Sequence, residues 1–288
     1  MTEKFKLLQI SDTHLSRTHA YFHDNWEVLL DAINDAQADI VVHSGDVSFN
    51  GPARADDLAF AREEMNKIAA PWRAIAGNHD IGESPAFSRL QQPLNDERIS
   101  AWRQNFGDLW WSCDMGAWRL IGLDTALLTS GLDLEAEQFA FLEQALRERG
   151  PREAMVFMHM PPFTGNPESQ AFTTAAVPFP ARQPLLDLCV ETGVKIIACG
   201  HLHVYQTLQY RGIDIVWAPT TAMISVQKQL GAFGRVPKPG YIEWMFEGRV
   251  ARHRFLQPEL MFMLDVTSWT DGHGQTTTGM PPKPLRRP

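Results

Sequence analysis

The sequence predicts a layered α/β fold, and three observations support this prediction. Short apolar runs alternate with segments whose apolar residues recur at helical spacing, as in a strand-helix-strand fold. The runs at 7–10 and 40–42 lack strict apolar-polar alternation, which is typical of strands buried on both faces of a sheet. Five apolar runs end directly in polar residues. We therefore expect one polar site where the strands end.

The predicted elements follow in a regular order through most of the chain. They are strands 7–10, 40–42, 72–76, 118–124, 154–158 and 194–199, with helices 25–38, 55–70, 135–149 and 184–192 between them. Trp26, Leu29 and Ile33 give the first helix its apolar face, and Pro71 ends the second helix. Strands 207–210, 213–217, 241–246 and 250–255 alternate with short turns, which predicts antiparallel pairing.

The domain organisation is expected to be simple. Residues 1–264 are predicted to form one domain, with insertions at 81–117 and 160–180 flanking the site, and 265–288 to form a polar, proline-rich tail. The first insertion is rich in aromatic residues, Trp102 and Trp110 among them. These side chains form either a satellite hydrophobic cluster or part of a substrate contact.

Composition excludes several classes of protein. The 288 residues carry a formal net charge of -8 and a sequence pI of about 5.7, so no overall basic field is present to hold long nucleic acid. The three cysteines show no CxxC spacing, which fits a reducing compartment. The N-terminal apolar span is too short for a signal peptide, and no run is long enough to cross a bilayer. The expectation is a soluble, cytoplasmic protein.

Polar side chains that could bind a metal follow five of the predicted strands. Asp12 and His14 are separated by one residue, so an extended segment points both side chains in the same direction. Taken alone, such a pair is more often part of a surface turn. The full set of candidate ligands is Asp12, His14, Asp46, Asn78, His159, His201 and His203. His43, inside a strand, is interpreted instead as a hydrogen-bonded core histidine.

The donor chemistry indicates the kind of metal site. Oxygen and nitrogen ligands without a thiolate suit Mn, Fe, Co or Zn better than calcium or a structural zinc. Seven ligands exceed the needs of one ion, so two divalent or trivalent ions are expected, about 3.5–4 Å apart. Such a pair needs a shared carboxylate, for which Asp46 is the natural choice. A two-metal centre is suited to holding hydroxide for in-line attack on phosphorus.

These motifs resemble those of the calcineurin-like metallophosphoesterases. The family pattern occurs in order as Asp12/His14, Gly45-Asp46, Gly77-Asn78-His79-Asp80, His159 and Gly200-His201-x-His203. The resemblance implies a four-layered αββα sandwich with a dinuclear site at its strand ends. It also implies one metal on Asp12, His14, Asp46 and His203, and the other on Asp46, Asn78, His159 and His201.

The same resemblance implies catalytic roles for the remaining polar residues of the motif. His79 would face the substrate phosphate, stabilise the transition state or protonate the leaving oxygen, with Asp80 as its orienting partner. A role of Asp80 as a helix N-cap is the alternative. Asn50, in the loop after Asp46, is a further candidate for contact with the phosphate.

Departures from the family pattern narrow the subclass. The GDxxDRG arginine of the serine/threonine phosphatases is missing, and the chain is closest to the class III cyclic-nucleotide phosphodiesterase and glycerophosphodiesterase group. That group often has HHPP where this chain has His159 followed by Met160, Pro161 and Pro162, so the substrate role of a second histidine is not expected here.

The predicted function is hydrolysis of small phosphate esters, with phosphodiesters favoured and cyclic nucleotides or glycerophosphodiesters as candidate substrates. A phosphomonoesterase or a DNA nuclease of the same superfamily is the enzymatic alternative, although the acidic balance disfavours the nuclease. A non-catalytic metal-binding scaffold is the alternative from a different class. Scaffolds of this kind lose ligands or the GNH histidine, and this chain retains all of them. The sequence is compatible with a homo-oligomer.

Overall fold

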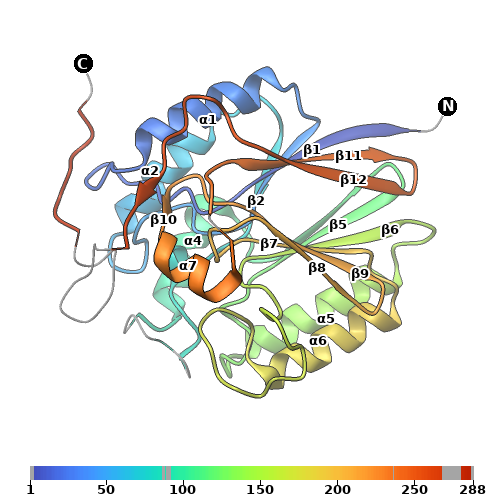
Figure 1. The fold of residues 1–288 in the computed structure, drawn as a ribbon. Coiled ribbons are helices and arrows are strands. Elements are labelled where there is room, and N and C mark those ends of the chain that lie inside the picture. The colour runs from blue at the N-terminus through green and yellow to red at the C-terminus, as the bar shows by residue number, and fades with distance from the viewer. Residues whose placement is uncertain (1–2, 86–87, 89–91, 236, 268–279, 287–288) are drawn as a thin grey trace.

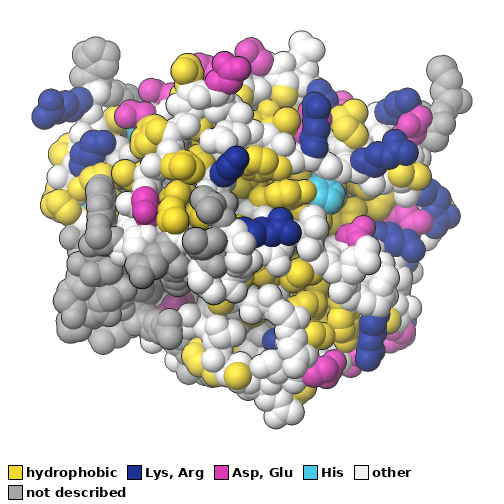
Figure 2. All heavy atoms as spheres, viewed as in Figure 1, with side chains coloured by type: hydrophobic (Ala, Val, Ile, Leu, Met, Phe, Trp, Pro, Cys, Tyr) yellow, Lys and Arg dark blue, Asp and Glu magenta, His cyan; other side chains and the backbone are white. Residues whose placement is uncertain are grey.

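Two β-sheets pack face to face, and helices cover the outer face of each (Figure 1). The computed structural model describes residues 3–85, 88, 92–235, 237–267 and 280–286. The helix-sheet-sheet-helix arrangement confirms the four-layered αββα sandwich. Basic and acidic side chains are interspersed on the face in view in Figure 2.

The first sheet is mixed and carries the N-terminal strands. Its order is β12 (Val250–Leu256), β11 (Tyr241–Glu247), β1 (Lys4–Ile10), β2 (Ile40–His43) and β3 (Trp72–Ala74). Strands β1, β2 and β3 are parallel, so their carboxyl ends meet at one edge of the sheet. The outer face packs against α1 (His23–Asp35), α2 (Ala55–Met65) and α4 (Asp96–Phe106) through a core that includes Leu8, Trp26 and Leu58.

The second sheet repeats this organisation with later segments. Its order is β4 (Trp111–Met115), β5 (Trp118–Leu123), β6 (Glu153–Met158), β7 (Ile196–Cys199), β9 (Ile213–Trp217) and β8 (Gln206–Tyr210). Strands β5, β6, β7 and β9 are parallel, and the two edge strands are antiparallel to their neighbours. Helices α5 (Asp133–Arg147) and α6 (Phe179–Glu191) pack on the outer face.

The inner faces of the sheets form a third core that fixes their relative position. Leu7, Val42, Leu120 and Phe157 are fully buried there, and truncating such a side chain to alanine costs roughly 2–5 kcal/mol. One polar residue also joins the sheets close to the strand ends. The buried amide of Gln9 donates to the Cys199 carbonyl of β7 at 3.2 Å and to Ser44 Oγ at 3.1 Å. The ends of β1 and β7 are therefore tied together directly.

Several elements differ from the sequence-based expectation. The 81–117 insertion contains α4 and β4, neither of which was expected, while residues 86–87 and 89–91 lie outside the described part. Asn95 caps α4 by accepting a hydrogen bond from the Arg98 N–H at 3.0 Å, a cap signal that the aromatic content of the segment obscured. Trp102 of α4 is fully buried and belongs to the core of the first sheet, which favours the hydrophobic-cluster interpretation for this residue.

Helix α6 begins earlier than the sequence predicted. It starts at Phe179, not at residue 184, because Pro180 occupies its first turn, where proline is tolerated. A two-stranded sheet of β10 (Met223–Ile224) and β13 (Leu264–Asp265) and the helix α7 (Val226–Phe233) were also not expected. Of the predicted 265–288 tail, residues 280–286 lie against the loop after β1, and 268–279 and 287–288 are not among the described residues.

Candidate metal centre

The strand ends of both sheets bring six of the predicted ligands into two adjoining groups. The first ligand group contains Asp12, His14, Asp46 and His203, and the second contains Asp46, His159 and His201. Within each group the ligand atoms lie within 4.8 Å of one another. Asp46 belongs to both groups, as a bridging carboxylate would.

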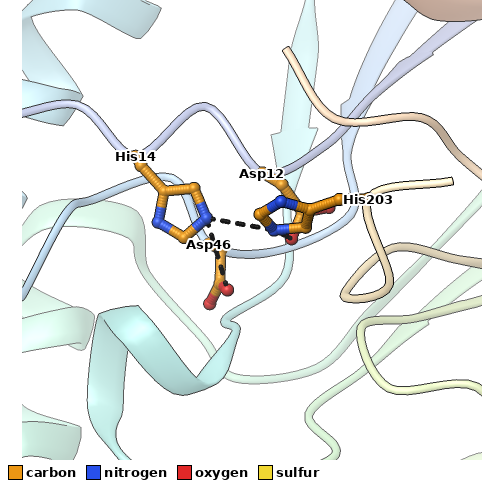
Figure 3. Close-up of side chains that lie close together, drawn as sticks. All are labelled: Asp12, His14, Asp46 and His203. Atoms are coloured by element: carbon orange, nitrogen blue, oxygen red, sulfur yellow. Dashed lines mark hydrogen bonds and ion pairs between the residues drawn. The ribbon is translucent and has the colours of Figure 1, made fainter. Parts of the chain in front are cut away.

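The first ligand group is compact and largely buried (Figure 3). Nε2 of His14 lies 3.3 Å from Nε2 of His203 and 3.8 Å from Oδ2 of Asp46. Nε2 of His203 lies 3.2 Å from Oδ1 of Asp12. Figure 3 shows the four side chains close together, with ring nitrogens of His14 and His203 pointing toward each other. Nitrogen and oxygen donors converging on one point are the arrangement that a transition-metal ion requires.

The second ligand group shares the Asp46 carboxylate with the first. Nε2 of His159 is 3.3 Å from Oδ2 of Asp46. Asn78 opens the single-turn helix α3 (Asn78–Ile81), directly between Gly77 and His79. The His79 N–H donates to Oδ1 of Asp46 at 2.8 Å, which holds this turn against the bridging carboxylate. Asn78 therefore lies beside the second group.

Close backbone approach explains the glycines that precede the ligands. A Cβ atom on Gly45 would overlap the ring of His159, and one on Gly77 would overlap the carboxylate of Asp46. Only glycine allows the chain to pass this close to these side chains.

Backbone conformation also marks the site. Five ligands have positive φ angles, a region that residues other than glycine rarely adopt: Asp12 (55°), His14 (47°), Asp46 (56°), His201 (72°) and His203 (57°). Such conformations each cost of order 1–3 kcal/mol and concentrate at functional sites. The strand ends are therefore strained where their side chains converge.

Backbone carbonyls fix the orientation of three ligand histidines. Nδ1 of His159 donates to the Ser44 carbonyl at 2.9 Å, and Nδ1 of His203 donates to the Met223 carbonyl at 2.7 Å. In both rings Nε2 is thereby the nitrogen that faces the group. His201 is held the other way round, through Nε2 and the Thr174 carbonyl at 2.7 Å. Hydrogen bonds of this kind fix the tautomer and the ring angle of metal-binding histidines.

The electrostatics of the groups fit cation binding. Burial alone would raise the pKa of Asp12, but the His203 imidazole lowers it to about 2. Burial likewise opposes ionisation of Asp46, but His159 and His79 hold its pKa well below the usual range. Burial and the neighbouring His79 lower the pKa of His14, and burial and His159 lower that of His201 to about 4. Ionised carboxylates and neutral imidazoles are the forms that bind metals.

His203 and His159 depart from this pattern. Burial lowers the pKa of both rings, but the Asp12 carboxylate raises the pKa of His203, and the Asp46 carboxylate raises that of His159 to about 10. The proton on His159 therefore balances the negative charge of Asp46. Binding of a metal cation in this position would release that proton.

His79 and Asp80 do not contact each other in the way the sequence suggested. Nδ1 of His79 donates to the Phe49 carbonyl at 3.0 Å. The Asp80 carboxylate accepts hydrogen bonds from the N–H groups of Val47, Ser48 and Gly77 at 3.1, 2.7 and 2.9 Å. Asp80 thus ties the turn of α3 to the loop after β2, as the third residue of the helix and not as its N-cap. Asp80 therefore orients His79 through the backbone of this turn and not through a contact with the imidazole ring.

Asn50 lies in the same loop and is already engaged. Its Oδ1 accepts a hydrogen bond from Nε2 of Gln92 at 3.0 Å. Its next neighbour Gly51 donates its N–H to the His79 carbonyl at 2.8 Å. The residue is half-buried and adjoins the His79 turn, so a substrate contact would require Gln92 to share the amide.

A pocket opens next to the second ligand group. Asn78 and His159 form part of its wall. The other lining residues come from the segments at 82–84 and 125–128 and from the loop between β6 and α6: Gly82, Glu83, Ser84, Thr125, Ala126, Leu128, Met160, Phe172, Thr173, Thr174, Ala176 and Pro178. Both predicted insertions therefore contribute to this wall.

Some residues of the site could not be found by motif. The carbonyls of Ser44, Phe49, Thr174 and Met223 hold histidines, but a backbone acceptor leaves no residue-type signal in a sequence. Phe22, whose ring centroid lies 6.2 Å from that of His14, is one of several apolar residues in its loop. The position of Phe22 beside His14 follows from the fold and not from a sequence motif.

The residues present fit a metal ion. Oδ1 of Asn78 is buried and accepts no hydrogen bond within the described part of the chain, so it lacks the partner that burial demands. A cation next to Asp46 would supply it. The fold and this donor set together define a metalloprotein whose ions would sit at the ends of parallel strands.

Comparison with known proteins identifies the family. Residues 5–205 match the model of the calcineurin-like phosphoesterases, and the chain belongs to that family. The resemblance drawn from the motifs is thereby confirmed. Family membership and the clustered ligands support the interpretation of the chain as a metal-dependent phosphoesterase.

Individual relatives are distant. The chain is 30% identical over 155 residues to the Bos taurus serine/threonine-protein phosphatase CPPED1, a match that spans 51% of this chain and only 45% of that protein. It is 23% identical to a probable glycerophosphodiester phosphodiesterase, GpdQ, of Arcobacter nitrofigilis, over 74% of this chain and 77% of the relative. A purple acid phosphatase from Lupinus luteus shares the fold, with 15% identity, a TM-score of 0.65 and coverage of 92% and 53% of the two chains.

Among the described residues, none of the helices combines the length and the apolar character needed to span a membrane.

Proposed function

We propose that the chain hydrolyses small phosphodiesters with the help of two divalent or trivalent ions, Mn, Fe, Zn or Co. One ion would be held by the first ligand group, and the other by the second group together with Asn78. The sharing of Asp46 between the two groups is the observation that carries this proposal. Metal ions bound in this way supply Lewis acidity toward phosphate oxygens and an activated water.

His79 is the proposed acid for the leaving group. Its Nδ1 is occupied by the Phe49 carbonyl, and within the described residues its Nε2 makes no hydrogen bond. The ring lies against His14, with 4.7 Å between the centroids, so it borders the first ligand group. A protonated His79 would present Nε2–H to the ester oxygen that leaves, and donation of that proton would restore the neutral ring.

The pocket beside the second ligand group supports a small organic ester as substrate. Among its described lining residues none is lysine or arginine, and Glu83 is the single carboxylate. Phe172 and Met160 supply apolar surface. Met160 stands where the resembled group often has a second histidine, so this wall would contact a carbon skeleton in place of a phosphate oxygen. A neutral alcohol moiety fits such a lining better than a charged one.

Hydrolysis of phosphomonoesters is the second candidate, favoured by the similarity to CPPED1. A monoester carries a charge of about −1.5 to −2 at neutral pH, whereas a diester carries one negative charge. With no lysine or arginine among the described lining residues, the second charge of a monoester would lack a protein partner. The diester is therefore the preferred substrate class, with glycerophosphodiesters and cyclic nucleotides as the candidates to test first.

The test is a substrate screen with Mn-loaded protein. Bis(p-nitrophenyl) phosphate, a glycerophosphodiester and a cyclic nucleotide are compared with p-nitrophenyl phosphate, a phosphopeptide and duplex DNA at equal metal content. We expect the small diesters to give the highest kcat/KM and the monoester to be slower. Preference for the phosphopeptide or for DNA would contradict the substrate class. Full metal occupancy without turnover of any ester would instead support a binding scaffold.

A further inference from the structure

The C-terminal segment 280–286 packs against the loop that leads from β1 to α1. Residues 280–286 lie alongside the loop that follows β1, where Lys283 and His19 form a parallel bridge. Four hydrogen bonds join the two segments: Lys283 N–H to Thr18 O at 2.9 Å, Ala20 N–H to Lys283 O at 2.9 Å, Leu285 N–H to Arg17 O at 2.8 Å and Tyr21 Oη–H to Pro281 O at 2.6 Å. These hydrogen bonds fix the register of segment 280–286 against residues 17–21.

Met280 anchors the segment in a small hydrophobic cluster. Its side chain is 5% exposed although its neighbours Pro281 and Pro282 are exposed. The buried members of this Met280 cluster are Phe22, Phe49, Ala222, Met223, Val266 and Met280. The cluster is separate from the three larger cores of the sandwich. Its members come from five separate parts of the sequence, so removal of one leaves the others with little local structure to hold them.

Three histidines of the site rest on this cluster. The ring of His14 meets the ring of Phe22 edge-on at 6.2 Å between centroids. Nδ1 of His203 donates to the carbonyl of Met223. Nδ1 of His79 donates to the carbonyl of Phe49, whose ring lies 6.2 Å from that of Phe22.

The other two histidines are supported elsewhere. His159 is held by the Ser44 carbonyl, and His201 by the Thr174 carbonyl. Neither acceptor belongs to the Met280 cluster. Loosening the cluster therefore affects both histidine ligands of the first group and leaves those of the second group in place.

We propose that segment 280–286, through Met280, is a positioning element for the first ligand group and sets the affinity of that group for its ion. This inference rests on the proposed function, because it takes the two ligand groups as metal sites. Loss of groups that orient a metal ligand typically lowers metal affinity about 10–100-fold. Met280 supports the residues that orient the ligands and does not orient a ligand itself. We therefore expect truncation of its side chain to lower the metal affinity of the first group about tenfold.

The experiment measures metal binding, not turnover. Mn²⁺ is titrated calorimetrically into metal-free protein carrying His201→Ala, which leaves the first group intact and weakens the second. In this background Met280→Ala should weaken binding of the remaining ion about tenfold. Met280→Leu, which conserves the volume, should restore most of the affinity. Met263→Ala is the matched control, because Met263 is 52% exposed and lies in the same C-terminal region.

A second background assigns the effect to one group. With His14→Ala in place of His201→Ala, the remaining ion reports on the second group, and Met280→Ala should leave its affinity unchanged. Unchanged binding in the first background, or equal losses in both, would contradict the inference. Deletion of residues 280–288 provides an independent variant that should reproduce the Met280→Ala pattern. A wild-type chain that binds fewer than two ions would contradict the proposed function itself.

Discussion

The two ligand groups share one carboxylate but differ in what surrounds them. The histidines of the first group rest on the Met280 cluster, which includes a segment from the far end of the chain. The histidines of the second group are held by single carbonyls, and His159 forms part of a pocket wall. One group therefore rests on apolar packing, and the other adjoins a pocket.

From this difference we expect the two ligand groups to have separate roles in hydrolysis. Packing from several directions favours a fixed geometry, which suits a site that holds its ion throughout turnover. A group that adjoins a pocket suits contact with the reacting phosphate and its substituent. Substitutions that act on one group, on both or on neither can test this division.

The largest effect is expected from the residue that both groups contain. Asp46→Asn removes the charge that attracts both ions and should nearly abolish hydrolysis while lowering the affinity of both groups. Metal content after gel filtration and the rate with bis(p-nitrophenyl) phosphate measure the two effects. Asp214→Asn is a matched control on the exposed side of β9. Normal metal content together with a normal rate in Asp46→Asn would show that Asp46 is not the bridge.

A smaller effect is expected from His79, which borders the first group without belonging to it. His79→Ala removes the proposed proton donor and should lower kcat by roughly 10²–10⁴-fold, the usual range for lost acid catalysis. Both ions should remain, because the His79 contact with Asp46 is made by its backbone N–H. A loss of metal on this substitution would make His79 a ligand and would shift the boundary of the first group.

The motifs predicted the convergence of these side chains better than they predicted the rest of the fold, for a physical reason. Each ligand follows a strand, and parallel strands place their carboxyl ends together, so a local pattern such as Gly45-Asp46 predicts a position in space. Helix α4 and the docking of Met280 lack such a pattern. Trp102 and Met280 are buried only because of what the fold places around them, and a short sequence window does not carry that information.

The pocket next to the second group allows a test with a moderate effect. Phe172→Ala removes an apolar side chain that is 52% exposed and lines the pocket. We expect kcat/KM for bis(p-nitrophenyl) phosphate to fall about tenfold, since apolar contacts of this size contribute about 1–3 kcal/mol to discrimination. A compact dialkyl phosphate should be affected less, and metal content should not change. Phe262→Ala, a partly exposed aromatic outside the pocket lining, is the matched control. Equal losses for both substrates would place the ester group elsewhere.

The smallest effect concerns Asp124, a buried carboxyl at the end of β5 whose pKa responds to the charge of His159 in the second group. Its Oδ1 accepts from the Ala126 N–H at 2.8 Å, while Oδ2 is buried without a hydrogen-bond partner among the described residues. Burial raises its pKa from 3.8 to about 7. The folded chain therefore retains this proton at a pH where the unfolded chain has released it.

The sign of the pH dependence follows from this difference. Between about pH 4 and pH 7 the folded state binds the extra proton, so the contribution of Asp124 to the free energy of unfolding falls as pH rises, by at most about 1.4 kcal/mol per pH unit. Asp124→Asn does not titrate, so its stability relative to the wild type should improve between about pH 5 and about pH 7. Urea unfolding of metal-free protein measures the difference. Parallel pH profiles for the two proteins would mean that Asp124 is ionised in the fold, and His159 of the second group would then have a further carboxylate charge nearby besides that of Asp46.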